Sequence, residues 1–166
     1  MKIVIISDSH DNLPNIEKML DWVLKNEIQI IIHCGDLAAP SVLVREFQPK
    51  FKGQFHFVHG NVADYELNEK IASEFDNMTC HGNQGFLKID GKKIAFCHYP
   101  NQADKLAETG KYDLVFYGHD HKPWEKNIGK TKLFNPGTLA GMFNKATFAV
   151  YDTKADRAKL ILLEKI

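Results

Sequence analysis

The chain has 166 residues, enough for one domain with a sizeable core. Its 21 Lys and Arg balance its 21 Asp and Glu, and zero formal net charge argues against a non-specific nucleic-acid binder, which needs a basic face. Cys34, Cys80 and Cys97 are too few and too widely spaced for a disulfide framework, and the apolar run at residues 3–6 is too short to span a membrane. We therefore expect a cytoplasmic protein without membrane association and without a strong nucleic-acid signal.

The first half of the chain alternates predicted strands with predicted helices. Strands are expected in three short runs rich in β-branched or aromatic residues: 2–7, 29–33 and 54–59. Pro14 begins a helix whose apolar side chains recur at helical spacing: Ile16, Met19, Leu20, Val23 and Leu24. Pro40 begins a second helix, which is expected to stop before Pro49. This order favours a parallel sheet with right-handed crossovers.

The second half is richer in predicted strands. Residues 85–90 and 92–97 are predicted to form a hairpin around Asp90-Gly91, and Asn101 is predicted to cap a short helix at residues 101–109. The remaining predicted strands are residues 112–117, 131–134, 146–151 and 158–163. The lysine-rich segment 122–132 is expected to be a solvated loop. Together these elements predict one α/β domain over residues 1–166, a four-layer α/β/β/α sandwich of two mixed sheets flanked by helices, with the change of sheet near residue 75.

Seven potential metal ligands lie at or beside the ends of predicted strands. They are Asp8, His10, Asp36, Asn61, His98, His119 and His121. Ligands of open α/β sheets bind beyond the carboxyl ends of the strands, so one fold would bring all seven to one rim. Mixed Asp, Asn and His side chains suit Mn²⁺, Fe²⁺, Co²⁺, Ni²⁺ or Zn²⁺ better than Mg²⁺. Any one of them alone would more often be a turn or capping residue, but their joint order favours a site for two adjacent cations.

In order, these motifs are Asp-x-His, Gly-Asp, Gly-Asn, His and Gly-His-x-His. They resemble the calcineurin-like metallophosphoesterase superfamily, and more narrowly its small single-domain phosphodiesterases, to which the small retromer subunit is related. The resemblance implies one metal held by Asp8, His10 and His121, a second held by Asn61, His98 and His119, and Asp36 as the bridge. It implies two divalent ions, with Mn²⁺ favoured, and catalytic roles for Asp36, Asn61 and His98.

The function that this resemblance implies is hydrolysis of a small phosphodiester by attack of a metal-bridging hydroxide, with the two ions about 3.5–4 Å apart. Two alternatives stay open: a phosphomonoesterase or nucleotide pyrophosphatase that uses the same site, and a non-catalytic scaffold of the retromer-subunit type. Many relatives are dimers, so a homodimer is a further expectation.

The sequence departs from the family pattern in places that bear on activity. Val62 stands where many relatives have a histidine that protonates the leaving group, and Tyr99 stands where glycine is common. The segment 139–143 lacks the basic residue often found there. Asn12 is expected either to open the first helix or to touch substrate. The remaining histidines in strand-like runs are expected to be structural: His33, His56, His59 and His81.

Overall fold

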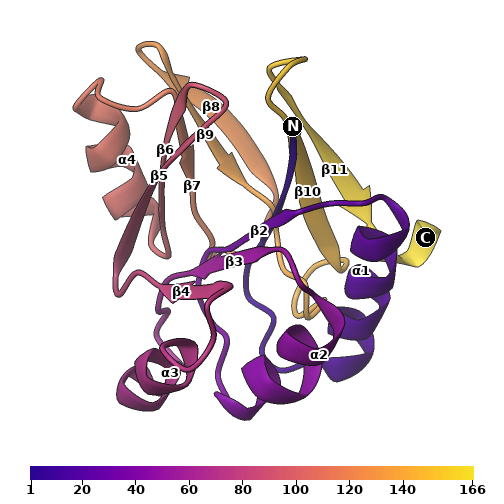
Figure 1. Cartoon of the computed structure of the whole chain (residues 1–166). Coiled ribbons are helices and arrows are strands. Elements are labelled where there is room, and N and C mark those ends of the chain that lie inside the picture. The colour runs from indigo at the N-terminus through magenta and orange to yellow at the C-terminus, as the bar shows by residue number, and fades with distance from the viewer.

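Two mixed β-sheets lie face to face with helices on their outer sides in the computed structural model, which describes residues 1–166 (Figure 1). The six-stranded sheet has the order β11-β10-β1-β2-β3-β4. Its strands are β1 (Lys2–Ile6), β2 (Ile30–His33), β3 (Gln54–Phe57), β4 (Met78–Cys80), β10 (Thr147–Asp152) and β11 (Arg157–Leu162). Strands β1 to β4 are parallel, as predicted for the first three, and β10 is antiparallel to both of its neighbours.

The five-stranded sheet has the order β5-β6-β7-β9-β8. Its strands are β5 (Gln84–Ile89), β6 (Lys92–Cys97), β7 (Leu114–Phe116), β8 (Trp124–Ile128) and β9 (Thr131–Asn135). The predicted β5–β6 hairpin is present, with Asp90 and Gly91 at positive φ in its turn. The change of sheet falls between β4 and β5 and not near residue 75, because β4 still pairs with β3.

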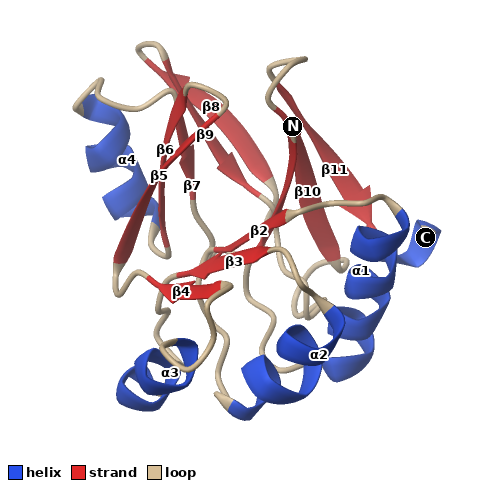
Figure 2. Ribbon diagram, viewed as in Figure 1, coloured by secondary structure: helices blue, strands red, loops and turns tan.

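Helices cover both outer faces, so the four-layer arrangement is confirmed (Figure 2). The helices α1 (Leu13–Lys25), α2 (Gln48–Lys50) and α3 (Tyr65–Ala72) lie on the six-stranded side, and α4 (Pro100–Glu108) lies on the five-stranded side. A π-helical segment, η1 (Leu43–Phe47), leads into α2, and a short 3₁₀ helix, η2 (Leu163–Lys165), follows β11. None of these helices has the length and apolar character needed to cross a membrane.

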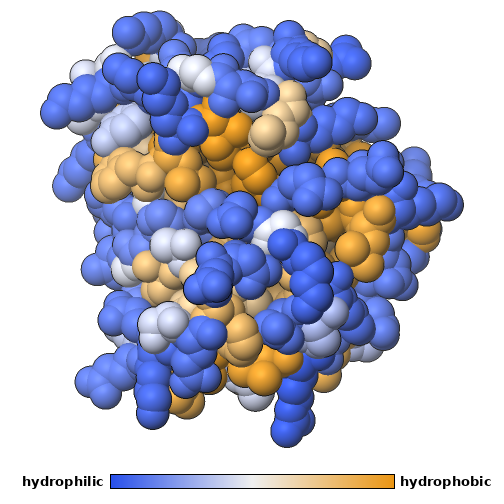
Figure 3. All heavy atoms as spheres, in the orientation of Figure 1, coloured by the Kyte–Doolittle hydropathy of each residue, from blue (hydrophilic) through white to orange (hydrophobic).

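Successive side chains of a strand point to opposite faces of the sheet, which divides the core into layers. Ile3 and Ile5 of β1 face the second sheet, where they pack with Phe96 and Phe116, while Val4 and Ile6 face the helices of the six-stranded side. A smaller apolar cluster lies under α4. On the face of the molecule in Figure 3, hydrophilic residues cover most of the surface, and hydrophobic residues show as patches near the middle, at the right and along the lower edge. The two layers hold the strand ends at fixed positions relative to each other.

Several predicted boundaries were wrong. The second helix does not stop before Pro49, because one helical segment runs from residue 41 to residue 50 and Pro49 lies within it, just after the π-helical turn η1. The fourth helix begins at Pro100, with Tyr99 as its N-cap in place of Asn101. Leu24 was expected on the buried stripe of α1 but is 48% exposed.

The lysine-rich segment is not simply a loop. Its middle forms β8, which pairs antiparallel with β9 at the edge of the sheet. The segment looked like a loop because an edge strand keeps most of its side chains in solvent, and Trp124, Glu125 and Asn127 are exposed here.

Candidate metal centre

All seven predicted ligand residues meet at the rim formed by the carboxyl ends of β1, β2, β3, β6 and β7. Asp8, Asp36 and His98 are almost fully buried and form the floor of this site. Asn61 and His119 are exposed at its mouth. Buried carboxylate and imidazole groups therefore lie beside exposed ones at this rim.

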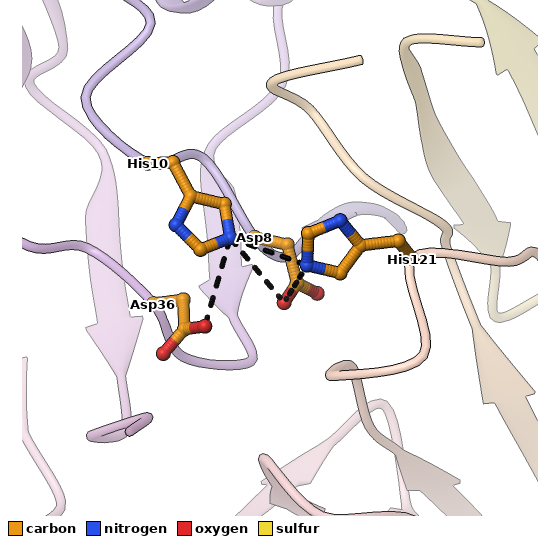
Figure 4. Close-up of side chains that lie close together, drawn as sticks. All are labelled: Asp8, His10, Asp36 and His121. Carbon is orange, nitrogen blue, oxygen red and sulfur yellow. Dashed lines mark hydrogen bonds and ion pairs between the residues drawn. The ribbon is translucent and has the colours of Figure 1, made fainter. Parts of the chain in front are cut away.

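One group of side chains lies around His10 and His121, whose Nε2 atoms are 3.2 Å apart (Figure 4). Asp8 Oδ1 lies 3.3 Å from His121 Nε2, and Asp36 Oδ2 lies 3.6 Å from His10 Nε2. These four side chains place their ligand atoms within 4.8 Å of one another. Two imidazole nitrogens and two carboxylate oxygens therefore point at one small volume.

The other group contains Asn61, His98 and His119. Asn61 Oδ1 lies 3.0 Å from His98 Nε2 and 3.1 Å from His119 Nδ1. The two imidazole nitrogens are themselves 3.2 Å apart. Asp36 joins the groups, because its Oδ1 lies 3.5 Å from His98 Nε2 while its Oδ2 faces His10.

The backbone of five of these residues is left-handed, with positive φ at each: Asp8, His10, Asp36, His119 and His121. Asp and His adopt this conformation more readily than most residues, although it still costs energy. The loops are tied to one another by backbone hydrogen bonds, from Asp8 N to Gly35 O (3.0 Å) and from His10 N to Asp36 O (3.0 Å). The fold thus holds the ligand loops in place before any ligand arrives.

The buried charges and imidazole rings of this site have the electrostatic character of a cation-binding site. Asp8 is fully buried and its Oδ1 has no hydrogen-bond partner. Burial raises the pKa of Asp8 to about 7, and burial lowers the pKa of His10 and of His98. A buried carboxylate oxygen without a partner, beside neutral imidazoles with free lone pairs, is what a bound divalent cation would satisfy. The donor set therefore fits divalent metal ions.

Hydrogen bonds to backbone carbonyl groups orient two of the imidazole rings. His98 Nδ1 donates to Cys34 O at 2.9 Å, and His121 Nδ1 donates to Met142 O at 3.3 Å. A carbonyl oxygen can only accept, so each ring carries a proton on Nδ1, and Nε2 is the nitrogen that faces the site. This is the common outer-shell arrangement of metal-binding histidines.

A chain of hydrogen bonds beneath these loops was not predicted from the sequence. Buried His33 accepts a hydrogen bond from Gly35 N (3.1 Å) at Nδ1, so its Nε2 donates to Ser9 Oγ (2.9 Å), which in turn donates to Asp36 O (3.3 Å). Burial lowers the pKa of His33 to about 3, so this ring stays neutral. The expectation of a satisfied core histidine is confirmed. Its additional role in joining two ligand loops had only one sequence signal, its position two residues before Gly35.

The residues that depart from the family pattern surround the same site. The Val62 backbone N–H donates to Asp36 Oδ1 at 3.2 Å, and the Val62 side chain is 42% exposed. The ring centroid of Tyr99 lies 5.0 Å from that of His98 and 4.9 Å from that of His119. Asn12 caps α1 by accepting from Asn15 N, which confirms its structural role.

The family model for the calcineurin-like phosphoesterase superfamily domain matches residues 1–156. The chain belongs to the calcineurin-like phosphoesterase superfamily, as its motifs indicated, and is an enzyme of the metallophosphoesterase kind. Phosphodiesterase MJ0936 of Methanocaldococcus jannaschii is 28% identical over an alignment that covers 99% of this chain and 100% of that protein.

Solved structures agree with this assignment. A structure described as that of a novel archaeal phosphodiesterase matches with a TM-score of 0.85 and 26% identity, over 98% of this chain and 99% of that one. Wild-type Vps29 from Entamoeba histolytica, solved with zinc, matches with a TM-score of 0.67 over 98% of this chain and 99% of that one. At 16% identity this second likeness concerns the fold alone.

Proposed function

We propose that this chain is a metal-dependent phosphodiesterase with a two-metal site. The observation that carries the proposal is the Asp36 carboxylate, whose two oxygens face two separate groups of ligand side chains. A bridging carboxylate is what allows two like-charged ions to sit close together. The similarity to proteins named phosphodiesterases supports the choice of substrate class.

In this proposal Asp8, His10 and His121 hold one ion, and Asn61, His98 and His119 hold the other. Two bound ions would supply the positive charge that binds a phosphate and the Lewis acidity that activates a water molecule. The protein's contribution is positional: the outer partners Cys34 and Met142 aim two imidazoles, and the His33–Ser9 bonds fix the two loops that carry the carboxylates. The resemblance favours Mn²⁺ among the ions that suit this set.

Substrate choice follows from what the mouth of the site lacks. Val62 cannot donate a proton from its side chain, and its backbone N–H is already used by Asp36. General acid catalysis is worth about 10²–10⁴ in rate, so substrates with good leaving groups are favoured. Tyr99, packed edge-on against His98 and His119, lies where it could contact the leaving group. We infer a small phosphodiester with an aryl or similarly acidic leaving alcohol.

Two other functions use the same fold. A phosphomonoesterase or pyrophosphatase would share every ligand, and rates on matched mono- and diesters separate it from a diesterase. A scaffold would have no need for the full ligand set or for an unpartnered buried carboxylate oxygen at Asp8. Homodimer formation and a cytoplasmic location remain predictions, with size-exclusion chromatography and cell fractionation as their tests.

The proposal is tested by stripping the protein of metal, adding Mn²⁺, and measuring hydrolysis of an activated aryl phosphodiester. We expect turnover only with metal, and its near-complete loss in Asp36→Asn, because a neutral amide has one oxygen ligand in place of two. Asp64→Asn is the matched control, since it removes the same charge at an exposed helix cap that asparagine also fills. Metal-independent turnover, or equal turnover in the two variants, would rule the proposal out.

A further inference from the structure

A second group of metal-ligating side chains lies outside the seven-residue site. His59 follows β3, Cys80 ends β4, and Glu69 lies in α3. His59 Nε2 is 3.0 Å from Glu69 Oε1 and 3.6 Å from Cys80 Sγ. All three ligand atoms lie within 4.8 Å of one another. Glu69 and Cys80 lie 10 and 21 residues after His59 in the sequence, and none of the three contributes a ligand to the first site.

The spacing fits a tetrahedral ion. Zinc bonds of about 2.0–2.1 Å to nitrogen and about 2.3 Å to sulfur, at a tetrahedral angle, place the two ligand atoms about 3.5 Å apart. The observed separation of His59 Nε2 and Cys80 Sγ is 3.6 Å. A zinc ion could therefore bind with little movement of the two side chains that are held by the sheet.

The ligand atoms of this second group favour a different metal ion from the one that the seven-residue site favours. A thiolate with an imidazole and a carboxylate favours zinc over the harder Mn²⁺, and the first site contains no sulfur. His59 is 5% exposed, Cys80 is half-buried and the Glu69 side chain is 59% exposed. Access from solvent is thus through Glu69, and a fourth position remains for water.

We propose that His59, Cys80 and Glu69 form a separate zinc-binding site that fastens α3 to the ends of β3 and β4. Contacts made by His59 extend from this second site to the residues beside Asn61 in the first site. The His59 ring stacks on Tyr65 at 4.4 Å between centroids, and Tyr65 Oη donates to Gly60 O at 2.8 Å. Zinc bound there holds the segment that leads directly into Asn61, without contacting substrate.

Because only this second site contains a sulfur ligand, metal bound there can be detected separately from metal bound at the seven-residue site. Titration of the metal-free full chain with Cd²⁺ is expected to produce a thiolate-to-metal absorption band that saturates at one equivalent of sulfur-bound ion. Burial raises the pKa of the Cys80 thiol, so the free protein contributes no thiolate background. Cys34 and Cys97 are fully buried and belong to the apolar core. Zinc is expected to compete the band away and to slow alkylation of Cys80.

The variants separate this proposal from the proposed function. The band is expected to vanish in Cys80→Ser and to persist in Asp36→Asn, which affects only the first site. Glu69→Gln removes one ligand at an exposed position and is expected to weaken zinc binding on the order of tenfold or more, while Glu66→Gln on the same helix leaves it unchanged. No band, a band that survives in Cys80→Ser, or equal affinities for Glu69→Gln and Glu66→Gln would overturn the site.

Discussion

His33 shows how one buried side chain can set the position of ligands that it never touches. Its ring links Gly35 to Ser9, and Ser9 links back to Asp36, so two ligand loops share one hydrogen-bond chain. Because the ring is fully buried, the protonated form is strongly disfavoured in the folded protein. Folding is therefore coupled to the titration of this residue.

His33 gives a prediction about pH and stability. The folded pKa is about 3 and the ordinary value is 6.5, so below about pH 6.5 the unfolded chain binds a proton that the folded chain does not. The stability contribution is complete above that pH and falls by up to about 1.4 kcal/mol per unit as the pH drops toward 3. In His33→Gln this dependence is absent, so the difference in unfolding free energy between wild type and variant shrinks on acidification.

Urea unfolding of both proteins between about pH 7 and about pH 5 measures that difference. Comparing the two cancels the titration of Asp8, whose raised pKa acts in the opposite direction. A difference that stays constant over this range would contradict the assignment.

Val62 gives a prediction about leaving groups. Val62 is 42% exposed and belongs to none of the apolar core clusters, so Val62→His should leave the core intact. If the missing acid limits poor substrates, the variant should accelerate an alkyl phosphodiester by a factor approaching about 10²–10⁴ while changing an activated aryl diester little. The ratio of the two turnover rates is the measurement, with Val62→Gln as a polar control. An unchanged ratio would argue against the proposed role of this position.

The geometry of the site depends on the close approach of the loop that contains Asp36 and the loop that contains Gly60. A Cβ on Gly60 would lie 1.9 Å from Asp36 Oδ1 and 2.4 Å from Asp36 N. The Asp36 loop cannot readily move away, because Ser9 Oγ and the His10 backbone N–H both donate to Asp36 O. Glycine is required here by space, independently of its own φ.

Gly60→Ala is expected to displace the Asp36 carboxylate and lower turnover about 10²-fold, which is the usual effect of misplacing a reacting group by an ångström. The protein should still fold, and its metal affinity, measured by calorimetry, should fall in parallel. Gly129→Ala is the control, because a Cβ there meets no atom within 4 Å, although its positive φ costs about 1 kcal/mol. Equal turnover in the two variants would show that the approach is not essential.

The sequence predicted long apolar elements well and weakly buried ones badly. Helix α3 escaped notice because only Asn68 and Ala72 of its eight residues are buried, which leaves no apolar stripe. Strand β4 has three residues, too few for alternation, and β8 is a solvated edge strand. These elements exist because their neighbours pair with them or pack against them, which is tertiary information.

The site shows the same division. The seven proposed ligand residues could be picked out because each side chain has metal-binding chemistry and adjoins a recognisable strand, and the structure brings them together. Their left-handed backbone, the His33–Ser9 chain and the second cluster at His59 could not be found, because each depends on loops meeting across the fold. The residue types identified candidate ligands in the sequence, whereas only the three-dimensional structure shows which of these residues lie together.

The proposed ligands come from both sheets. Asp8, His10, Asp36 and Asn61 follow strands of the six-stranded sheet, and His98, His119 and His121 follow strands of the five-stranded sheet. An ion that binds side chains from both halves is lost when the sheets separate. Metal binding and global unfolding must therefore be linked.

Mn²⁺ is expected to raise the thermal unfolding midpoint of the metal-free protein. At a concentration one hundred times the dissociation constant, a single ion adds about 2.7 kcal/mol, which corresponds to roughly 5–11 °C for a chain of this size. Calorimetry across a range of Mn²⁺ concentrations provides the measurement, and Asp36→Asn should lose most of the shift. A midpoint that is independent of Mn²⁺ would contradict a site shared between the sheets.

The left-handed backbone at five ligand positions has a consequence for mutagenesis. An alanine at Asp8, His10, Asp36, His119 or His121 would lose the ligand and also force a methyl-bearing residue into a conformation that costs about 1 kcal/mol or more. An alanine scan of this rim would therefore overstate the importance of these five residues by adding a folding defect to a chemical one. Asparagine tolerates the same backbone, so asparagine replacements would change the ligand group without that added folding cost.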